Sequence, residues 1–129
     1  MTPAEFKTLR EGMGLAAEEV AALLGVTRKT VFAMESPTRT LDVPEEHAVG
    51  LRAVADRFRD AVERFMEEGD LIRFTDEAAF RKHYGVAKGL TRKRKSDHPA
   101  AHEPLPLSMQ GPLIFAVLGY RGSPVEYAR

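Results

Sequence analysis

The first 37 residues contain three short runs of hydrophobic positions at helical spacing, separated by turn residues. Thr2 and Glu5 have the spacing of a capping box, and Pro3 lies between them at the first helical position. This arrangement predicts a helix that begins at Pro3. Because two glycines interrupt the pattern, the helix is expected to end at Gly12 and Gly14.

The second and third runs predict two more short helices with a tight connection between them. Apolar positions over residues 17–24 form one stripe, and Gly25 supplies the left-handed residue that often ends a helix. Thr27 can cap the next helix because its hydroxyl group can accept a hydrogen bond from an amide two or three residues later. Val31 would lie on the inward face of that helix, and Pro37 stops it.

A much longer helical pattern begins at Pro44 and lasts until Glu68, where Gly69 ends it. Its apolar positions recur at alternating steps of four and three residues, at Leu51, Ala55, Phe58, Val62 and Phe65. One helix cannot bury such a heptad seam alone. Two interpretations stand: the seam packs on the C-terminal segment of the same chain, or it packs across a dimer, and both can hold at once.

After Asp70 the pattern becomes mixed. Residues 71–74 predict a short strand, and residues 76–84 predict a short helix capped by Thr75. Residues 85–104 combine glycines, prolines and a basic run, and they show no apolar periodicity. We therefore expect an exposed, mobile loop there.

The last segment completes a mainly α architecture. Residues 105–107 predict a second strand, and Ser108 is expected to cap a final helix that runs through Ile114 and Leu118 to Gly119. Pro112 would lie in the first turn of that helix, where its missing amide is tolerated. Three segments result: short helices in residues 1–43, a long linking helix in 44–69, and a small α+β subdomain in 70–129.

Composition limits the possibilities further. A chain of 129 residues with 43% hydrophobic and 29% charged residues has room for one compact domain, or for a small domain with a subdomain. The 19 basic and 19 acidic side chains cancel, so any attraction to nucleic acid must be local. No apolar run approaches the roughly 20 residues that a membrane helix needs, and we expect a cytoplasmic protein. Cysteine is absent, which excludes disulfides and thiolate metal sites.

Residues 17–35, with the sequence AEEVAALLGVTRKTVFAME, carry the most specific pattern in the chain. A small residue at Ala21 lets two helices cross closely, Gly25 makes the turn, and Val31 fills the junction. The segment resembles the helix-turn-helix of phage repressor and Cro-type regulators. That resemblance implies that the second helix lies in the major groove of DNA while the first crosses the backbone.

The resemblance also implies which side chains contact DNA. They are Thr27, Arg28, Lys29, Thr30, Phe32 and Ala33, with Ala17 and Arg39 at the margins. Arg28 is the first candidate for base recognition because its planar fork can donate two hydrogen bonds to guanine. Lys29 can contact a base or a phosphate, Thr27 a phosphate, and Phe32 a thymine methyl group.

The charge around this segment is not basic. Residues 1–43 hold five basic and six acidic side chains: Lys7, Arg10, Arg28, Lys29 and Arg39 against Glu5, Glu11, Glu18, Glu19, Glu35 and Asp42. The resembling family usually has glutamine in place of Ala17 and a polar or basic residue in place of Ala33. Specificity should therefore depend heavily on Arg28 and Lys29, and useful affinity should require a dimer.

A second group of cations lies downstream. Arg92, Lys93, Arg94 and Lys95 are consecutive, and Arg81, Lys82 and Lys88 precede them. Such a run can form a solvated loop, or it can contact the phosphates of DNA or RNA. Both interpretations stay open.

The whole arrangement resembles the short repressors that accompany anti-CRISPR genes in phages, and their relatives. The similarity rests on the helix-turn-helix, the long helix, the Leu-Ile-Arg-Phe strand with its following helix, and the Leu-Ser end segment. It implies a homodimer that binds an inverted repeat in double-stranded DNA and represses its own operon. The residues then expected near the dimer interface are Leu71, Phe74, Leu113, Phe115 and Leu118.

Two other functions were weighed against repression. An enzyme is disfavoured because His47, His83, His98 and His102 lack metal-ligand spacing, and neither a phosphate-binding glycine loop nor a nucleophile elbow is present. No metal or cofactor is expected. The alternative is an antitoxin, because antitoxins often carry the same helix-turn-helix beside a segment that binds a toxin.

Overall fold

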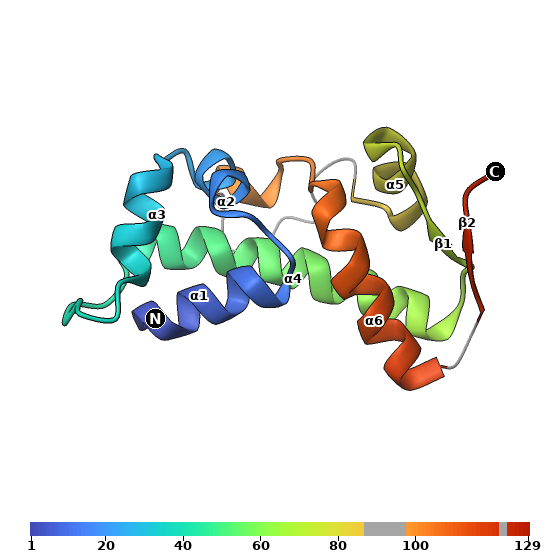
Figure 1. The fold of residues 1–129 in the computed structure, drawn as a ribbon, viewed down its shortest axis with the longest axis horizontal. Helices are drawn as coiled ribbons and strands as arrows, with labels where there is room; N and C mark the ends of the chain where they lie inside the picture. The colour runs from blue at the N-terminus through green and yellow to red at the C-terminus, as the bar shows by residue number, and fades with distance from the viewer. Residues whose placement is uncertain (87–97, 122–123) are drawn as a thin grey trace.

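The computed structural model describes residues 1–86, 98–121 and 124–129, and these form a mainly helical fold with one small sheet (Figure 1). The helices are α1 (Pro3–Gly12), α2 (Ala17–Leu24), α3 (Arg28–Glu35), α4 (Glu45–Glu67), α5 (Glu77–Tyr84) and α6 (Gln110–Arg121). Strands β1 (Leu71–Arg73) and β2 (Val125–Tyr127) pair, and two 3₁₀ turns are η1 (Pro99–Ala101) and η2 (Leu107–Met109). Helix α4 runs through the molecule, with α1 to α3 at one end and the sheet at the other.

The first three helices begin and end where the sequence predicts. The Thr2 side chain accepts from the amide of Glu5 at 3.1 Å, and the Thr27 side chain accepts from the amide of Thr30 at 3.1 Å. Gly25 follows α2 with a φ of 69°, in the left-handed region that favours glycine. These local signals confirm the predicted boundaries.

Helix α4 buries its seam within the chain. Of the predicted seam, Leu51, Val62 and Phe65 are buried, and α4 packs against α1, α2, η1 and α6. Figure 1 shows α6 crossing α4. The expected packing of the seam on the C-terminal segment of the same chain is therefore present. Ala55 and Phe58 of the predicted seam are only half-buried, whereas Val54, Arg57 and Ala61 are buried.

The C-terminal segment corrects two predictions. Asp76, rather than Thr75, caps α5, and its carboxylate accepts from the amide of Ala79 at 2.8 Å. The second strand is not formed by residues 105–107: Leu105 is buried ahead of η2. Instead β2 pairs in parallel with β1, and Leu71 lies opposite Val125 in the register.

The predicted exposed loop over residues 85–104 is exposed at Gly85, Pro99 and residues 102–104, but not throughout its described ends. Val86 and Ala100 are buried, and Arg57 of α4 donates to the carbonyl oxygens of Ala100 at 3.1 Å and Glu103 at 2.5 Å. Burial lowers the pKa of Arg57 to about 10. The basic run at Arg92, Lys93, Arg94 and Lys95 lies outside the described residues.

The N-terminal helices are joined to the start of α6 by close contacts. Ser108 does not cap the final helix; its hydroxyl group donates to the carboxylate of Glu19 at 2.8 Å. Gly14 has a φ of 75°, and a Cβ atom there would lie 2.6 Å from the Ser108 carbonyl oxygen and 2.8 Å from Pro112. Only glycine fits this turn.

All three predicted segments contribute to one continuous core. Its buried side chains include Phe6 from α1, Leu51 from α4, Tyr84 from α5 and Leu113 from α6. Among the helices of the described residues, none is both long and apolar enough to cross a membrane.

Candidate nucleic-acid interface

Helix α3 has one buried face and one exposed face. Val31 and Met34 are buried against the other helices. The exposed side chains are Thr27, Arg28, Lys29, Phe32 and Ala33, and Thr30 is half-buried. Six of the eight predicted contact residues therefore lie along one accessible helix face or at its margin.

The connection between α2 and α3 is short and well defined. The amide of Val26 donates to the Ala21 carbonyl at 3.0 Å, which closes the turn around Gly25. Ala21 and Val31 are both buried, as their predicted roles at the helix crossing require. A Cβ atom at Gly25 would meet nothing within 4 Å, so backbone conformation rather than space selects glycine there.

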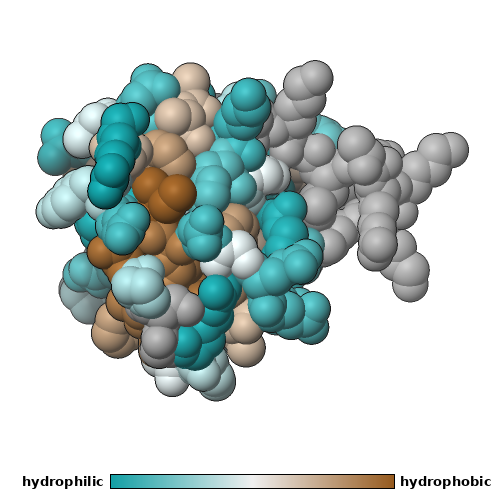
Figure 2. Space-filling model, turned by 90° about the vertical axis from the view of Figure 1, so that its right-hand side faces the viewer, coloured by the Kyte–Doolittle hydropathy of each residue, from teal (hydrophilic) through white to brown (hydrophobic). Residues whose placement is uncertain are grey.

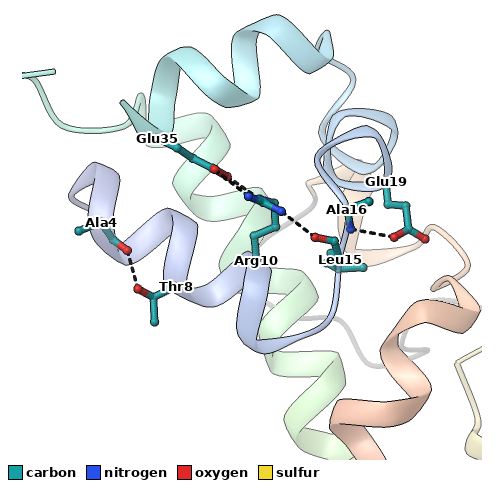
Figure 3. Close-up of polar contacts among 7 residues, drawn as sticks. All are labelled: Ala4, Thr8, Arg10, Leu15, Ala16, Glu19 and Glu35. Carbon is teal, nitrogen blue, oxygen red and sulfur yellow. Dashed lines mark hydrogen bonds and ion pairs between the residues drawn. The ribbon is translucent and has the colours of Figure 1, made fainter. Parts of the chain in front are cut away.

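A buried ion pair fixes α3 from the other side (Figure 3). Arg10 of α1 donates from Nε to Glu35 Oε1 at 2.5 Å and from Nη2 to Glu35 Oε2 at 3.0 Å. Its Nη1 donates to the Leu15 carbonyl at 3.0 Å, so one guanidinium joins α1, α3 and the chain before α2. The hydrogen bond to Glu35 raises the pKa of Arg10. The side chain of its partner Glu35 is only 4% exposed, so the carboxylate faces the interior of the protein and not the solvent.

The sequence pattern does not predict this pair. Its only sequence signal is an acidic residue beside the inward-facing Met34, and such a residue fits a solvated helix face equally well. The pairing joins residues 25 positions apart, which helical periodicity cannot detect.

Arg28 is held at the surface by two neighbours. Its Nε atom lies 2.8 Å from Oε1 of Glu18 on α2, and its Cζ atom lies 5.1 Å from the centroid of the Phe32 ring. The side chains of Arg28 and Glu18 are 63% and 60% exposed. The guanidinium is therefore accessible and also oriented.

Ala17 and Arg39, and the cap residue Thr27, are less available for a contact with DNA. Ala17 is buried, with 5% exposure, so its predicted contact with DNA is wrong. Its methyl group belongs to the hydrophobic core, at the start of α2. The Thr27 hydroxyl is engaged by the Thr30 amide and hydroxyl group. Half-buried Arg39 donates to the carbonyls of Leu41 at 3.1 Å and Asp42 at 3.2 Å, which shapes the loop after α3.

The residues predicted at a dimer interface divide into two groups. Leu71 and Leu113 have 2% and 1% exposure, so both belong to the interior of the chain, which corrects the expectation for them. Phe74 is half-buried, whereas Phe115 and Leu118 of α6 are 80% and 38% exposed. Figure 2 shows hydrophobic side chains gathered on the end of the molecule that carries the sheet.

Polar side chains fix α6 and β1 to this end of the molecule. Gln110 is buried, and its amide group both donates to the Phe74 carbonyl at 3.1 Å and accepts from the Phe74 amide at 2.6 Å. Arg121 donates to the carbonyls of Phe65 at 2.5 Å and Gly69 at 2.8 Å. The exposed face of α6 is therefore held in a defined orientation.

A cleft of about 440 Å³ separates the end of α2 from the start of α4 and η1. Its polar lining includes Glu46, His47, His98 and Glu103. The helices approach closely beside it: a Cβ atom on Gly50 would lie 2.6 Å from both His98 and Leu24. In the described part of the chain, no three histidine or acidic side chains come together in a way that could hold a metal ion.

Comparison with known proteins yields no similarity to report: no family model, no curated protein and no solved structure matches the chain.

Proposed function

We propose that the chain is a transcriptional repressor that binds duplex DNA with α3 in the major groove. The observation that carries the proposal is the accessible face of α3, where Arg28 and Lys29 are exposed beside Phe32. The opposite face is fixed by Val31 and by the Arg10–Glu35 pair. A rigid helix with a polar, cationic outer face is what groove recognition requires.

The dimensions of α3 support this proposal. The helix is eight residues long, and an α-helix with its side chains is roughly 10–12 Å across. The major groove of B-form DNA is about 12 Å wide and admits one α-helix. The short turn at Gly25 leaves the N-terminal half of α3 free of covering chain within the described residues. In this proposal α2 and α3 form the helix-turn-helix, and α2 lies across the DNA backbone.

The exposed side chains supply three kinds of contact. Arg28 presents a planar fork that suits the two acceptors of guanine, a contact that discriminates by about 1–3 kcal/mol. Lys29 donates to a base edge or a phosphate, and the Phe32 ring contacts a thymine methyl group.

A homodimer is the second part of the proposal. One helix contacts only a few base pairs, and residues 1–43 hold one more acidic than basic side chain, so a single copy would bind weakly. Two copies would reach half-sites about 34–36 Å apart in an inverted repeat. Phe115, Leu118 and Tyr120 offer exposed apolar area for the pairing.

The repressor would act on its own operon, as in the phage repressors that its sequence resembles. A repressor bound over a promoter excludes polymerase, so its own synthesis falls as its concentration rises. A heterologous protein bound to the same α6 surface would instead indicate the antitoxin alternative.

The first experiment selects preferred sites from a pool of random duplexes with the wild-type protein and with Arg28→Ala. We expect the wild type to enrich an inverted repeat that contains guanine, and the variant to lose the guanine preference. Arg59→Ala is the matched control, because Arg59 is also exposed and paired with a carboxylate but lies on α4. Unchanged base preference in Arg28→Ala, or no enrichment by the wild type, would contradict the proposal.

A further inference from the structure

Glu18 and Arg28 lie on successive helices and meet at the surface. Glu18 is the second residue of α2, and Arg28 is the first residue of α3. The carboxylate oxygen lies 2.8 Å from Nε of the guanidinium, while the Phe32 ring contacts the guanidinium at 5.1 Å. A carboxylate from one helix and a ring from the other therefore restrain the same cation.

We propose that Glu18 is a positioning residue that orients Arg28 for guanine, an inference that rests on the proposed DNA-binding function. A free arginine side chain has many rotamers and loses them on binding. In this chain the contact with Glu18 already restricts the rotamers of Arg28 in the absence of DNA. Glu18 thus acts on base selectivity through Arg28 and makes no base contact of its own.

The side of the guanidinium that Glu18 contacts leaves the fork of Arg28 directed to a base. The Glu18 carboxylate lies on the Nε side of the guanidinium, which leaves the two terminal nitrogens to donate to a base. Guanine offers two acceptors, O6 and N7, at the spacing of such a fork. Adenine offers N7 beside an amino donor, so the second terminal nitrogen would face another donor.

The Phe32 ring adds a second restraint. Because a guanidinium stacks on an aromatic face, the ring favours a single plane for the fork. Phe32 is 47% exposed, so this stacking occurs at the accessible face of α3. The plane and the in-plane rotation of the guanidinium are then restrained by different side chains.

A competing role for Glu18 makes a different prediction. A carboxylate beside DNA repels phosphates, and its removal would strengthen binding to every sequence by the same factor. Positioning, by contrast, changes the ratio of affinities for two sequences. A uniform electrostatic effect changes both affinities by the same factor and leaves their ratio unchanged. The ratio therefore distinguishes the positioning of Arg28 from the repulsion of phosphates.

The test measures the Kd of each variant for the selected site and for the same site with the Arg28-dependent guanine replaced by adenine. The wild type should prefer guanine by about tenfold or more. Glu18→Ala should lower that ratio at least threefold. Glu63→Ala is the control, because it removes an exposed carboxylate near the C-terminal end of α4. Circular dichroism verifies that each variant is folded.

A double variant completes the design. If Glu18 acts through Arg28, the double variant Glu18→Ala, Arg28→Ala should show the same ratio of Kd values for the two sites as Arg28→Ala alone. A wild-type ratio in Glu18→Ala would overturn the positioning role while the DNA-binding function stands. Absence of any sequence preference in the wild type would instead overturn the proposed function, and the inference with it.

Discussion

Tyr84 is the largest of the fully buried side chains, and its hydroxyl group is bonded on both sides. It donates to the Ile72 carbonyl at 2.7 Å and accepts from the Ile72 amide at 3.1 Å. The ring packs against Phe65 and Phe80, at centroid distances of 4.7 Å and 5.4 Å. Burial raises the pKa of Tyr84 because the phenolate would lose its hydration.

This raised pKa predicts a loss of stability in alkali. An unfolded tyrosine ionises near about pH 10, so above that pH the unfolded chain releases a proton that the folded chain retains. The contribution is fully present below the unfolded pKa and declines as the pH rises toward the folded one, by up to about 1.4 kcal/mol per pH unit. Urea unfolding from pH 8 to pH 11 should show this decline in the wild type and less of it in Tyr84→Phe.

Tyr120→Phe is the control for that series, because Tyr120 is exposed. At neutral pH, Tyr84→Phe should also cost about 1–3 kcal/mol, since it leaves backbone groups of Ile72 without their partner. An identical pH dependence in Tyr84→Phe and the wild type would refute the assignment.

Which residue contacts could be predicted depends on their separation in the sequence. Caps by Thr2 and Thr27 act over three residues, so the local pattern was sufficient to find them. Thr75 and Asp76 are both good caps, and the one-residue error between them reflects that equivalence. The contact predicted for Ala17 is wrong because it came from the position of this residue in the helix-turn-helix pattern. The burial of the side chain was not part of that inference.

At the scale of elements, α3 depends on α1 for its orientation. The Arg10–Glu35 pair is bidentate, and Arg10 also bonds to the chain between α1 and α2. Its side chains are 12% and 4% exposed, so the pair is little screened by solvent. Such a pair gives strong orientation, and loss of either partner leaves a buried charge.

Glu35→Leu should therefore destabilise the fold by about 3 kcal/mol, because it leaves the Arg10 guanidinium without its carboxylate. Arg10→Met combined with Glu35→Leu should be much less damaging, since neither charge is then buried alone. Chemical unfolding measures both free energies. Arg59→Ala, which breaks an exposed pair, should change stability by less than about 1 kcal/mol. A double variant as unstable as Glu35→Leu would count against this account.

Element boundaries were predictable where caps and glycines act locally, and pairings were not. Strand β2 joins β1 across more than fifty positions, and its sequence has no strong strand pattern. Leu105 looked like part of a strand, but burial against the core explains its apolar character equally well. Arg57 was overlooked because buried arginine is rare and its partners are backbone carbonyls.

At the scale of the whole molecule, α4 joins the candidate DNA surface to the apolar face of α6. Side chains from every segment share one core, so α3 and α6 belong to one packed unit. Direct contacts also join the N-terminal helices to the start of α6. Gly14 lies against Ser108 and Pro112, and Glu19 accepts a hydrogen bond from Ser108. A dimer formed through α6 would therefore fix the distance between two copies of α3.

Phe115→Asp should weaken such a dimer, because Phe115 is 80% exposed and contributes little to the core. Sedimentation at micromolar concentration should show the wild type at twice the 14.3 kDa of one chain, and the variant nearer to a single chain. Leu41→Asp is the matched control, since Leu41 is 70% exposed but lies in the loop after α3. A monomeric wild type, or a variant as dimeric as the wild type, would exclude this surface.

Hydroxyl-radical footprinting on the selected duplex tests most directly whether α3 reads DNA in a two-fold symmetric dimer. We predict two protected patches related by a two-fold axis, with their centres about 34–36 Å apart or a multiple of that distance. Arg28→Ala should weaken protection of both patches together. A single asymmetric patch, or protection that Arg28→Ala leaves unchanged, would contradict that arrangement.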